Sequence, residues 1–219
     1  DQVHILVDMP GNKVRTTCFS ESIPLKIGKL IELDARNVDY ARFFEMLAEG
    51  EELLANDGLI RFEVVKIIPT KVVLRCKTDG ELGNNKGLHP NSTHSLPFLF
   101  EKDHNILDLV KRIDVNYVGV SFVRKPDEIK IVQKILDGAK VRPLFKIETK
   151  EAVKDLDQIL GLVDQILIDR GDLCADIGYV NIPHTQAVIM KKALERGVKV
   201  GLATQFLHSM LTRDVPLIA

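Results

Sequence analysis

Four polar residues have the types and spacing of a metal-dependent site. Lys146 and Glu148 lie two positions apart in a short apolar run, so on a strand their side chains point to the same side. Asp172 ends a second apolar run, and Thr204 lies near the end of a third. Two carboxylates facing a cavity can bind a hard divalent cation, because Mg²⁺ commonly takes one or two carboxylates with water and substrate oxygens. An ammonium beside them would stabilise a phosphoryl group or an enolate oxygen.

The same residues also have a purely structural interpretation. Lys146 and Glu148 could form an ion pair at the end of a strand, and Asp172 could cap a helix. Conversely, Gly171 and Asp172 open a helical turn, whose N–H groups can bind a carboxylate or a phosphate, and Thr204 offers a hydroxyl. On spacing alone the structural interpretation is slightly favoured.

The elements that position these residues alternate between two patterns. Short apolar runs predict strands at residues 3–8, 115–122, 144–148, 165–172 and 198–205. Amphipathic segments predict helices at residues 103–113, 127–136, 150–162, 183–197 and 206–212. This alternation is typical of a parallel α/β barrel or a doubly wound sheet, in which chemistry collects at the C-terminal strand ends. Because a closed barrel of this kind needs eight strands, we expect either an open sheet or a barrel whose remainder lies outside this chain.

The residues between the first predicted strand and the others have a different sequence pattern. Between residues 17 and 89, short β-type runs alternate with turn signals such as Asp57-Gly58 and Asp79-Gly80, which predicts an all-β insertion with one short helix at residues 40–48. The sequence therefore predicts an α/β domain of residues 1–16 and 90–219 and an inserted small β domain of residues 17–89.

Composition excludes several classes of protein. The 219 residues carry a net charge of −1 with both signs interspersed, so no general attraction to nucleic acid or to an anionic membrane is expected. The three cysteines, Cys18, Cys76 and Cys174, are widely spaced and predict buried reduced thiols rather than a disulfide or a zinc site. We find no apolar run of membrane-spanning length and no signal peptide, and a reducing, soluble compartment is expected. The first residue, Asp1, is not Met, so the start looks processed or incomplete.

Several motifs together strongly resemble the pyruvate kinase family. They run in the family's order along almost the whole chain, at residues 7–16, 56–60, 80–87, 95–97, 101–103, 120–124, 145–148, 168–173 and 202–205. The resemblance implies a partial (β/α)₈ TIM-barrel domain with an inserted β-barrel lid domain. It also implies a glycolytic phosphotransferase that moves a phosphoryl group from phosphoenolpyruvate to ADP, giving pyruvate and ATP.

Matching positions carry the family's roles to individual residues. Glu148 and Asp172 resemble the ligands of the catalytic Mg²⁺ (or Mn²⁺). Lys146 resembles the lysine that stabilises the transferring phosphoryl group and the enolate, and Thr204 the threonine associated with enolate protonation. The implied substrate-binding residues are Lys146, Gly171, Asp172 and Thr204.

The resemblance assigns further ligands and partners. Arg15, Asp57 and Lys86 match positions on the nucleotide side, and Asp8 matches a ligand of a monovalent cation, K⁺. The complete protein is expected to be a homo-oligomer, a tetramer, in the cytoplasm or a plastid, with no nucleic-acid or membrane partner.

Some positions depart from the family pattern. Met9-Pro10 replaces Thr-Lys, Asp169 replaces an alanine and adds a charge near the metal cluster, and Cys174 replaces a glycine. The chain also lacks the upstream Arg-x-Asn-x-Ser segment, the first two barrel strands, the eighth strand and the C-terminal domain, so we expect this piece alone to be inactive. These departures leave two alternatives: a catalytically impaired relative with a binding or assembly role, or a metal-dependent pyruvate-enolate lyase. The β insertion argues against the lyase, which has no use for a nucleotide lid.

Overall fold

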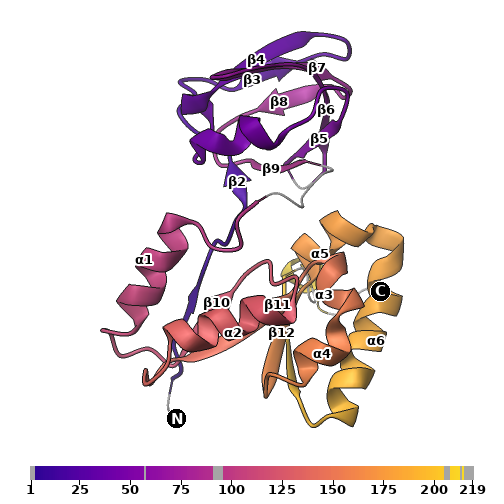
Figure 1. Cartoon of the computed structure of the whole chain (residues 1–219). Coiled ribbons are helices and arrows are strands. Elements are labelled where there is room, and N and C mark those ends of the chain that lie inside the picture. Colours follow the sequence, from indigo (N-terminus) through magenta and orange to yellow (C-terminus); the bar gives the residue numbers. More distant parts are fainter. Residues whose placement is uncertain (1–2, 57, 91–95, 205–207, 213, 215–219) are drawn as a thin grey trace. The chain divides into compact units, whose positions relative to one another are not determined.

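The computed structural model describes residues 3–56, 58–90, 96–204, 208–212 and 214. The chain forms two compact units, which we call the α/β unit (Asp1–Gly11 with Phe98–Ala219) and the β unit (Asn12–Pro97) (Figure 1). Each unit is described by itself below. The boundaries between the units lie at residues 11/12 and 97/98, whereas the boundaries predicted from the sequence lie at residues 16/17 and 89/90.

The α/β unit is built on a parallel sheet of five strands in chain order. They are β1 (Leu6–Asp8), β10 (Tyr117–Val120), β11 (Arg142–Ile147), β12 (Gln165–Asp169) and β13 (Lys199–Ala203). Its helices are α1 (Glu101–Val110), α2 (Pro126–Ile135), α3 (Lys150–Lys154), α4 (Leu156–Leu160), α5 (Arg170–Ile177) and α6 (Ile182–Glu195). The parallel α/β sheet predicted from the alternating patterns is confirmed.

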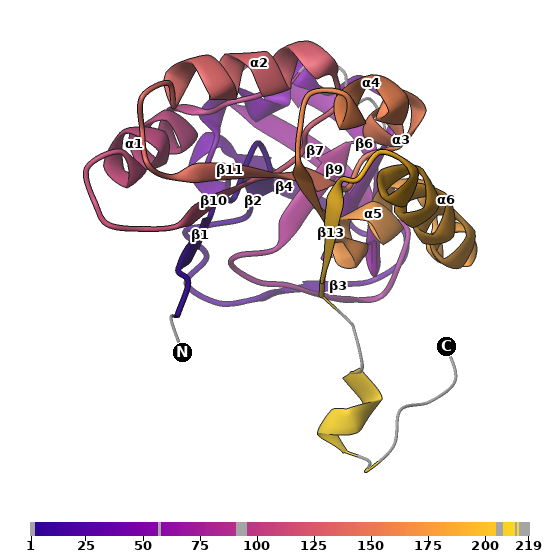
Figure 2. The same cartoon turned by 90° about the horizontal axis from the view of Figure 1, so that it is seen from below.

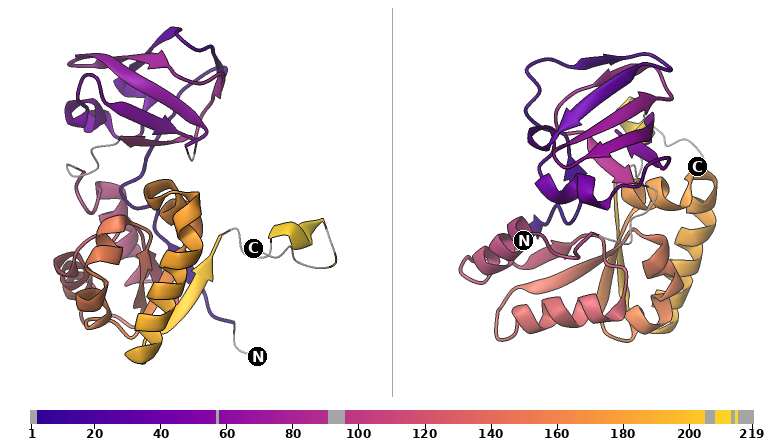
Figure 3. Two further views of the ribbon diagram at one scale, coloured as in Figure 1. Left: turned by 90° about the vertical axis from the view of Figure 1, so that its right-hand side faces the viewer. Right: turned by 45° about the horizontal axis from the view of Figure 1, so that its top comes forward.

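Helices cover the outer side of this curved sheet. Figure 2 shows α2, α4 and α6 along one side of the strands, and Figure 3 shows α6 running beside β13. Fully buried apolar residues from strands and helices form one core, among them Val118, Ile129, Ile159, Ile166 and Ile189. This core fixes the register in which Ile147 of β11 pairs with Ile168 of β12, so Glu148 and Asp169 follow at the same edge.

Some local elements differ in detail from the predictions. The first strand was expected to be buried, but Leu6 is 43% exposed because β1 lies at the edge of the sheet. The helix predicted over residues 150–162 is divided at Asp155 into α3 and α4. The segment predicted as a helix at residues 40–48 forms a 3₁₀ helix, η2 (Ala41–Met46). Of the helix predicted at residues 206–212, the described part is a 3₁₀ helix, η5 (His208–Leu211).

The β unit contains a six-stranded sheet and a two-stranded sheet. The larger has the order β2 (Val14–Arg15), β9 (Gly87–Pro90), β5 (Glu52–Ala55), β6 (Ile60–Ile68), β7 (Lys71–Cys76) and β4 (Leu30–Asp34), with antiparallel neighbours. The smaller pairs β3 (Ile23–Leu25) with β8 (Gly80–Leu82). Short 3₁₀ helices lie at η1 (Ala35–Asn37) in this unit and at η4 (Tyr179–Asn181) in the α/β unit.

The three cysteines differ in their burial. Cys76 is buried and Cys174 is half-buried, but Cys18 is exposed on a loop with a φ of 58°, so the prediction of three buried thiols was wrong for Cys18. All three are free thiols.

Among the residues that the structure describes, none of the helices has the length and apolar character of a membrane span.

A buried carboxyl at the start of α1 gives a pH-dependent stability. Oδ2 of Asp103 accepts a hydrogen bond from the Phe100 N–H at 2.8 Å, and burial raises the pKa of this carboxyl above its usual 3.8. Because the native state then binds the proton more tightly than the unfolded state, stability should fall as pH rises above about 4. In Asp103→Asn this contribution to the pH dependence of the free energy of unfolding should vanish. Urea unfolding at several pH values measures that dependence. Parallel slopes in both proteins would contradict the assignment.

Candidate functional site

Three carboxylates meet at the C-terminal edge of the parallel sheet. Glu148 follows β11, Asp169 ends β12, and Asp172 lies in the first turn of α5. One oxygen from each lies within 4.8 Å of the other two. The arrangement follows from topology, because parallel neighbouring strands place their C-terminal ends, and the loops after them, at one edge.

Glu148 is the most constrained member of this cluster. It is fully buried, and its Oε1 accepts a hydrogen bond from the Phe122 N–H at 2.5 Å, whereas Oε2 has no hydrogen-bond partner among the described residues. Burial raises the pKa of Glu148 to about 8; Lys146 opposes this rise, and Asp172 and Asp169 add to it. A buried acceptor without a partner costs about 1–3 kcal/mol. The cluster fits a divalent cation, which would satisfy that oxygen and favour ionised carboxylates.

Lys146 supplies a buried positive charge beside the carboxylates. Its Nζ lies 3.0 Å from the Asp8 carboxylate and 3.4 Å from Oδ2 of Asp169. Burial lowers the pKa of the ammonium, but the charges of Glu148, Asp8 and Asp169 outweigh it and raise the pKa overall. The lysine is therefore cationic at neutral pH, in an environment where its field is weakly screened.

Thr204 joins the same edge from the next strand. Its Oγ1 accepts a hydrogen bond from the Gly171 N–H at 2.8 Å and donates one to Oδ1 of Asp169 at 2.9 Å. Its φ of 61° lies in the left-handed region, which is uncommon for a β-branched residue. These contacts fix the hydroxyl between the end of β13 and the start of α5.

A second residue of this edge also has left-handed backbone. Phe122, two residues after β10, has a φ of 55°, and its N–H is the group that contacts Glu148. Sparsely populated conformations of this kind cluster at functional sites. Phe122 was not among the predicted site residues. Its place in the motif at residues 120–124 was a signal for it, since a backbone N–H leaves no trace in residue type.

Gly119 makes room for the Asp8 carboxylate. A methyl group at Gly119 would lie 2.5 Å from Oδ1 of Asp8, which is closer than real contacts allow. In Gly119→Ala we expect the Asp8 side chain to turn away and lose its ion pair with Lys146, because this half-exposed side chain has solvent to move into. A crystal structure of the variant should show more than about 4 Å between the two charged groups. An intact ion pair would contradict this prediction. Gly161→Ala, where a methyl meets nothing closer than 3.4 Å, is the control.

The residues predicted to bind the nucleotide belong to the β unit. Arg15 lies on β2 and donates from Nη1 to the Asn85 carbonyl at 3.3 Å. The backbone N–H and carbonyl of Lys86 both bond to Thr16, which holds the 83–87 turn beside β2. Asp57 lies outside the described residues.

The structure thus brings together most of the predicted site residues in the α/β unit. Glu148, Asp172, Lys146 and Thr204 gather at one strand edge, and Asp8 joins them through its ion pair with Lys146. From the sequence, Asp169 was expected only as a charge near the metal cluster. In the structure it is a member of the carboxylate cluster with Glu148 and Asp172.

Fold and site together define a class of protein. It is a parallel α/β protein with carboxylates, a buried ammonium and a hydroxyl at the C-terminal strand edge, where such folds bind their ligands. The chain matches the family model described as pyruvate kinase, barrel domain, over residues 1–219. It therefore belongs to the pyruvate kinase family, and the resemblance found in the sequence is confirmed.

Curated relatives agree with the family match. Proteins named pyruvate kinase from Clostridium perfringens, Methylorubrum extorquens and Thermotoga maritima are 31%, 32% and 30% identical to this chain. The alignments cover 97%, 98% and 98% of the chain but 48%, 47% and 49% of the relatives. The chain spans about half the length of the curated relatives it matches.

Proposed function

We propose that this chain is part of a pyruvate kinase that transfers the phosphoryl group of phosphoenolpyruvate to ADP, giving pyruvate and ATP. One observation carries the proposal: the carboxylates of Glu148 and Asp172 converge at a strand edge where Lys146 provides a buried ammonium. The family membership and the names of the relatives support it. In this proposal the five parallel strands are part of a (β/α)₈ barrel, and the β unit is the lid that closes over the nucleotide.

Each residue of the edge has a distinct proposed role. Glu148 and Asp172 hold Mg²⁺ or Mn²⁺, which when bound supplies positive charge to phosphoryl and enolate oxygens. Lys146 stabilises the charge that develops on the transferring group, and its burial makes that interaction strong. Gly171 and Asp172, in the first turn of α5, bind the substrate carboxylate through backbone N–H groups, and the Gly171 N–H exchanges its hydrogen bond to Thr204 for one to the substrate. The Thr204 hydroxyl is assigned to the protonation of the enolate carbon.

The remaining assignments complete the proposal. Arg15, Asp57 and Lys86 bind the nucleotide, and Asp8 is a ligand of K⁺. The protein is proposed to act in the cytoplasm as a homo-oligomer.

A coupled spectrophotometric assay of the intact protein tests the reaction. We expect ATP formation that depends on phosphoenolpyruvate, ADP and Mg²⁺, that stops on chelation of the metal, and that returns when Mg²⁺ is added back. Carbon–carbon cleavage of a pyruvate derivative without ATP formation would indicate a lyase instead.

One observation favours a second candidate, a catalytically impaired relative. Asp169 lies 3.4 Å from the ammonium of Lys146 and partly neutralises the charge that the reaction requires. Calorimetry separates the two candidates. A protein that binds neither Mg²⁺ nor phosphoenolpyruvate would have a binding or assembly role elsewhere, whereas binding with turnover supports the phosphotransferase.

A further inference from the structure

Asp169 is the feature of the site that the family pattern does not explain. It occupies the position where the resemblance implies an alanine, it is the last residue of β12, and it is 6% exposed. One of its carboxylate oxygens lies within 4.8 Å of oxygens of both Glu148 and Asp172. A side chain that is apolar in the family pattern is therefore an acid within the cluster.

The contacts of Asp169 leave it able to bind a further ligand. Oδ1 accepts a hydrogen bond from Thr204, and Oδ2 makes a long contact of 3.4 Å with Lys146. Because an ionised carboxylate offers about four lone-pair sites, these contacts do not exhaust its acceptor capacity. Lys146 is closer to Asp8, at 3.0 Å, so it does not neutralise Asp169 alone.

An independent observation indicates that the cluster suits a cation. Oε2 of Glu148 is buried in a residue with no exposed surface and has no hydrogen-bond partner within the part of the chain that the structure describes. Since the neighbouring groups of the cluster are acceptors as well, a cation satisfies this oxygen where another acceptor would not. Oxygen donors of this kind suit Mg²⁺ or Mn²⁺.

We propose that Asp169 is a third carboxylate ligand of the divalent cation, beside Glu148 and Asp172. This inference rests on the proposed function, since it extends the same metal site. Three protein carboxylates leave about three positions of an octahedral ion open to substrate oxygens and water. They also add negative charge around the ion. The chain should therefore hold the cation without an anionic substrate.

Mn²⁺ titration followed by electron paramagnetic resonance, without substrate, tests this ligand. In Asp169→Ala we expect affinity for Mn²⁺ to fall at least tenfold, and water-proton relaxation should report about one more water on the bound ion. Asp169→Asn, which keeps the size of the side chain, should weaken binding in the same direction and serves if the alanine variant does not fold. Asp164→Ala is the matched control, because Asp164 is exposed at the opposite end of β12 and should leave Mn²⁺ binding unchanged.

The outcomes separate this inference from the function on which it rests. If Glu148→Gln abolishes Mn²⁺ binding while both Asp169 variants bind as the wild type does, Asp169 is not a ligand and the metal site stands. If the Asp169 variants bind Mn²⁺ more weakly but the number of waters on the bound ion is unchanged, Asp169 acts only through its charge at a distance. That result would overturn the inference. A wild-type protein that binds no Mn²⁺ would overturn both.

Discussion

The Lys146→Met variant of the intact protein should lose about a hundred- to a thousandfold in kcat, while KM for phosphoenolpyruvate changes little. Methionine approximates the length of the lysine stem but carries no charge. The proposed role of the ammonium is to stabilise charge that grows towards the transition state, so its removal should affect turnover more than substrate binding. Steady-state kinetics with both substrates varied measures the two effects separately.

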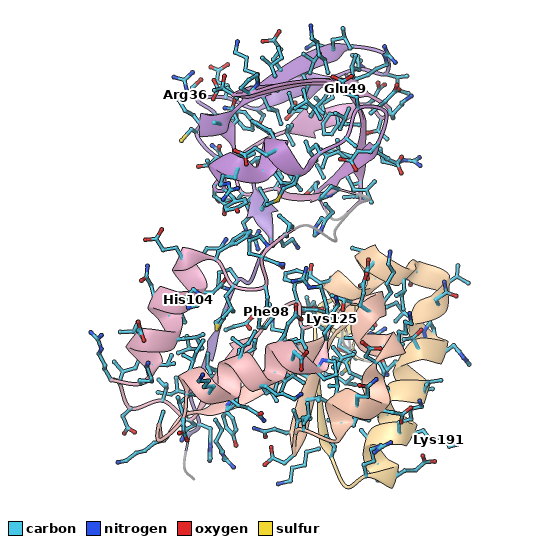
Figure 4. All side chains as sticks on the ribbon, viewed as in Figure 1. Arg36, Glu49, Phe98, His104, Lys125 and Lys191 are labelled. Atoms are coloured by element: carbon cyan, nitrogen blue, oxygen red, sulfur yellow. The ribbon has the colours of Figure 1, made fainter. Side chains whose placement is uncertain are left out.

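A matched substitution controls for the loss of a lysine as such. Lys191 lies on α6 with its side chain 78% exposed, and Figure 4 shows it at the outer surface of the α/β unit. Lys191→Met should therefore leave kcat unchanged. Circular dichroism should show that Lys146→Met keeps its secondary structure. Unchanged turnover in a folded Lys146→Met protein would remove Lys146 from the mechanism.

The second large effect is expected at Glu148. Glu148→Gln keeps the shape of the side chain but removes the ionised oxygen that a hard cation requires, so affinity for Mn²⁺ should fall by at least about a hundredfold and ATP formation with it. The variant should remain folded, because the buried site already disfavours the ionised carboxylate. Isothermal titration with Mn²⁺ measures the loss.

Glu195→Gln provides the comparison for Glu148. Glu195 ends α6 and its side chain is 60% exposed, so the same chemical change there should alter neither metal affinity nor turnover. A Glu148→Gln protein that binds Mn²⁺ as well as the Glu195→Gln protein would show that the metal site lies elsewhere.

Much of this site could be predicted because it depends on local periodicity. Lys146 on β11 and Glu148 directly after it were expected on one side by the two-residue period of a strand, and parallel pairing brings Asp172 to the same edge. The parallel sheet followed from the alternation of apolar and amphipathic segments, whereas the alternation left the order of its five strands open between a barrel and a doubly wound sheet. These signals lie within single helices and strands or between neighbouring ones, so residue types are enough to predict them.

Other features depend on tertiary detail that residue types do not record. The position of Asp169 inside the cluster depends on the register of β12 against β11. The contact of Phe122 with Glu148 is made by a backbone N–H in an uncommon conformation. The exposure of Leu6 depends on which strand ends the sheet. The sequence predicted the composition of the site more fully than its hydrogen bonds.

Anomalous X-ray diffraction from crystals of the intact protein soaked in Mn²⁺ tests the central claim most directly. The account predicts one manganese peak bonded to carboxylate oxygens of Glu148 and Asp172, with Lys146 nearby but not bonded to the ion. A manganese peak at a different place, or no peak at these two carboxylates at saturating Mn²⁺, would contradict it.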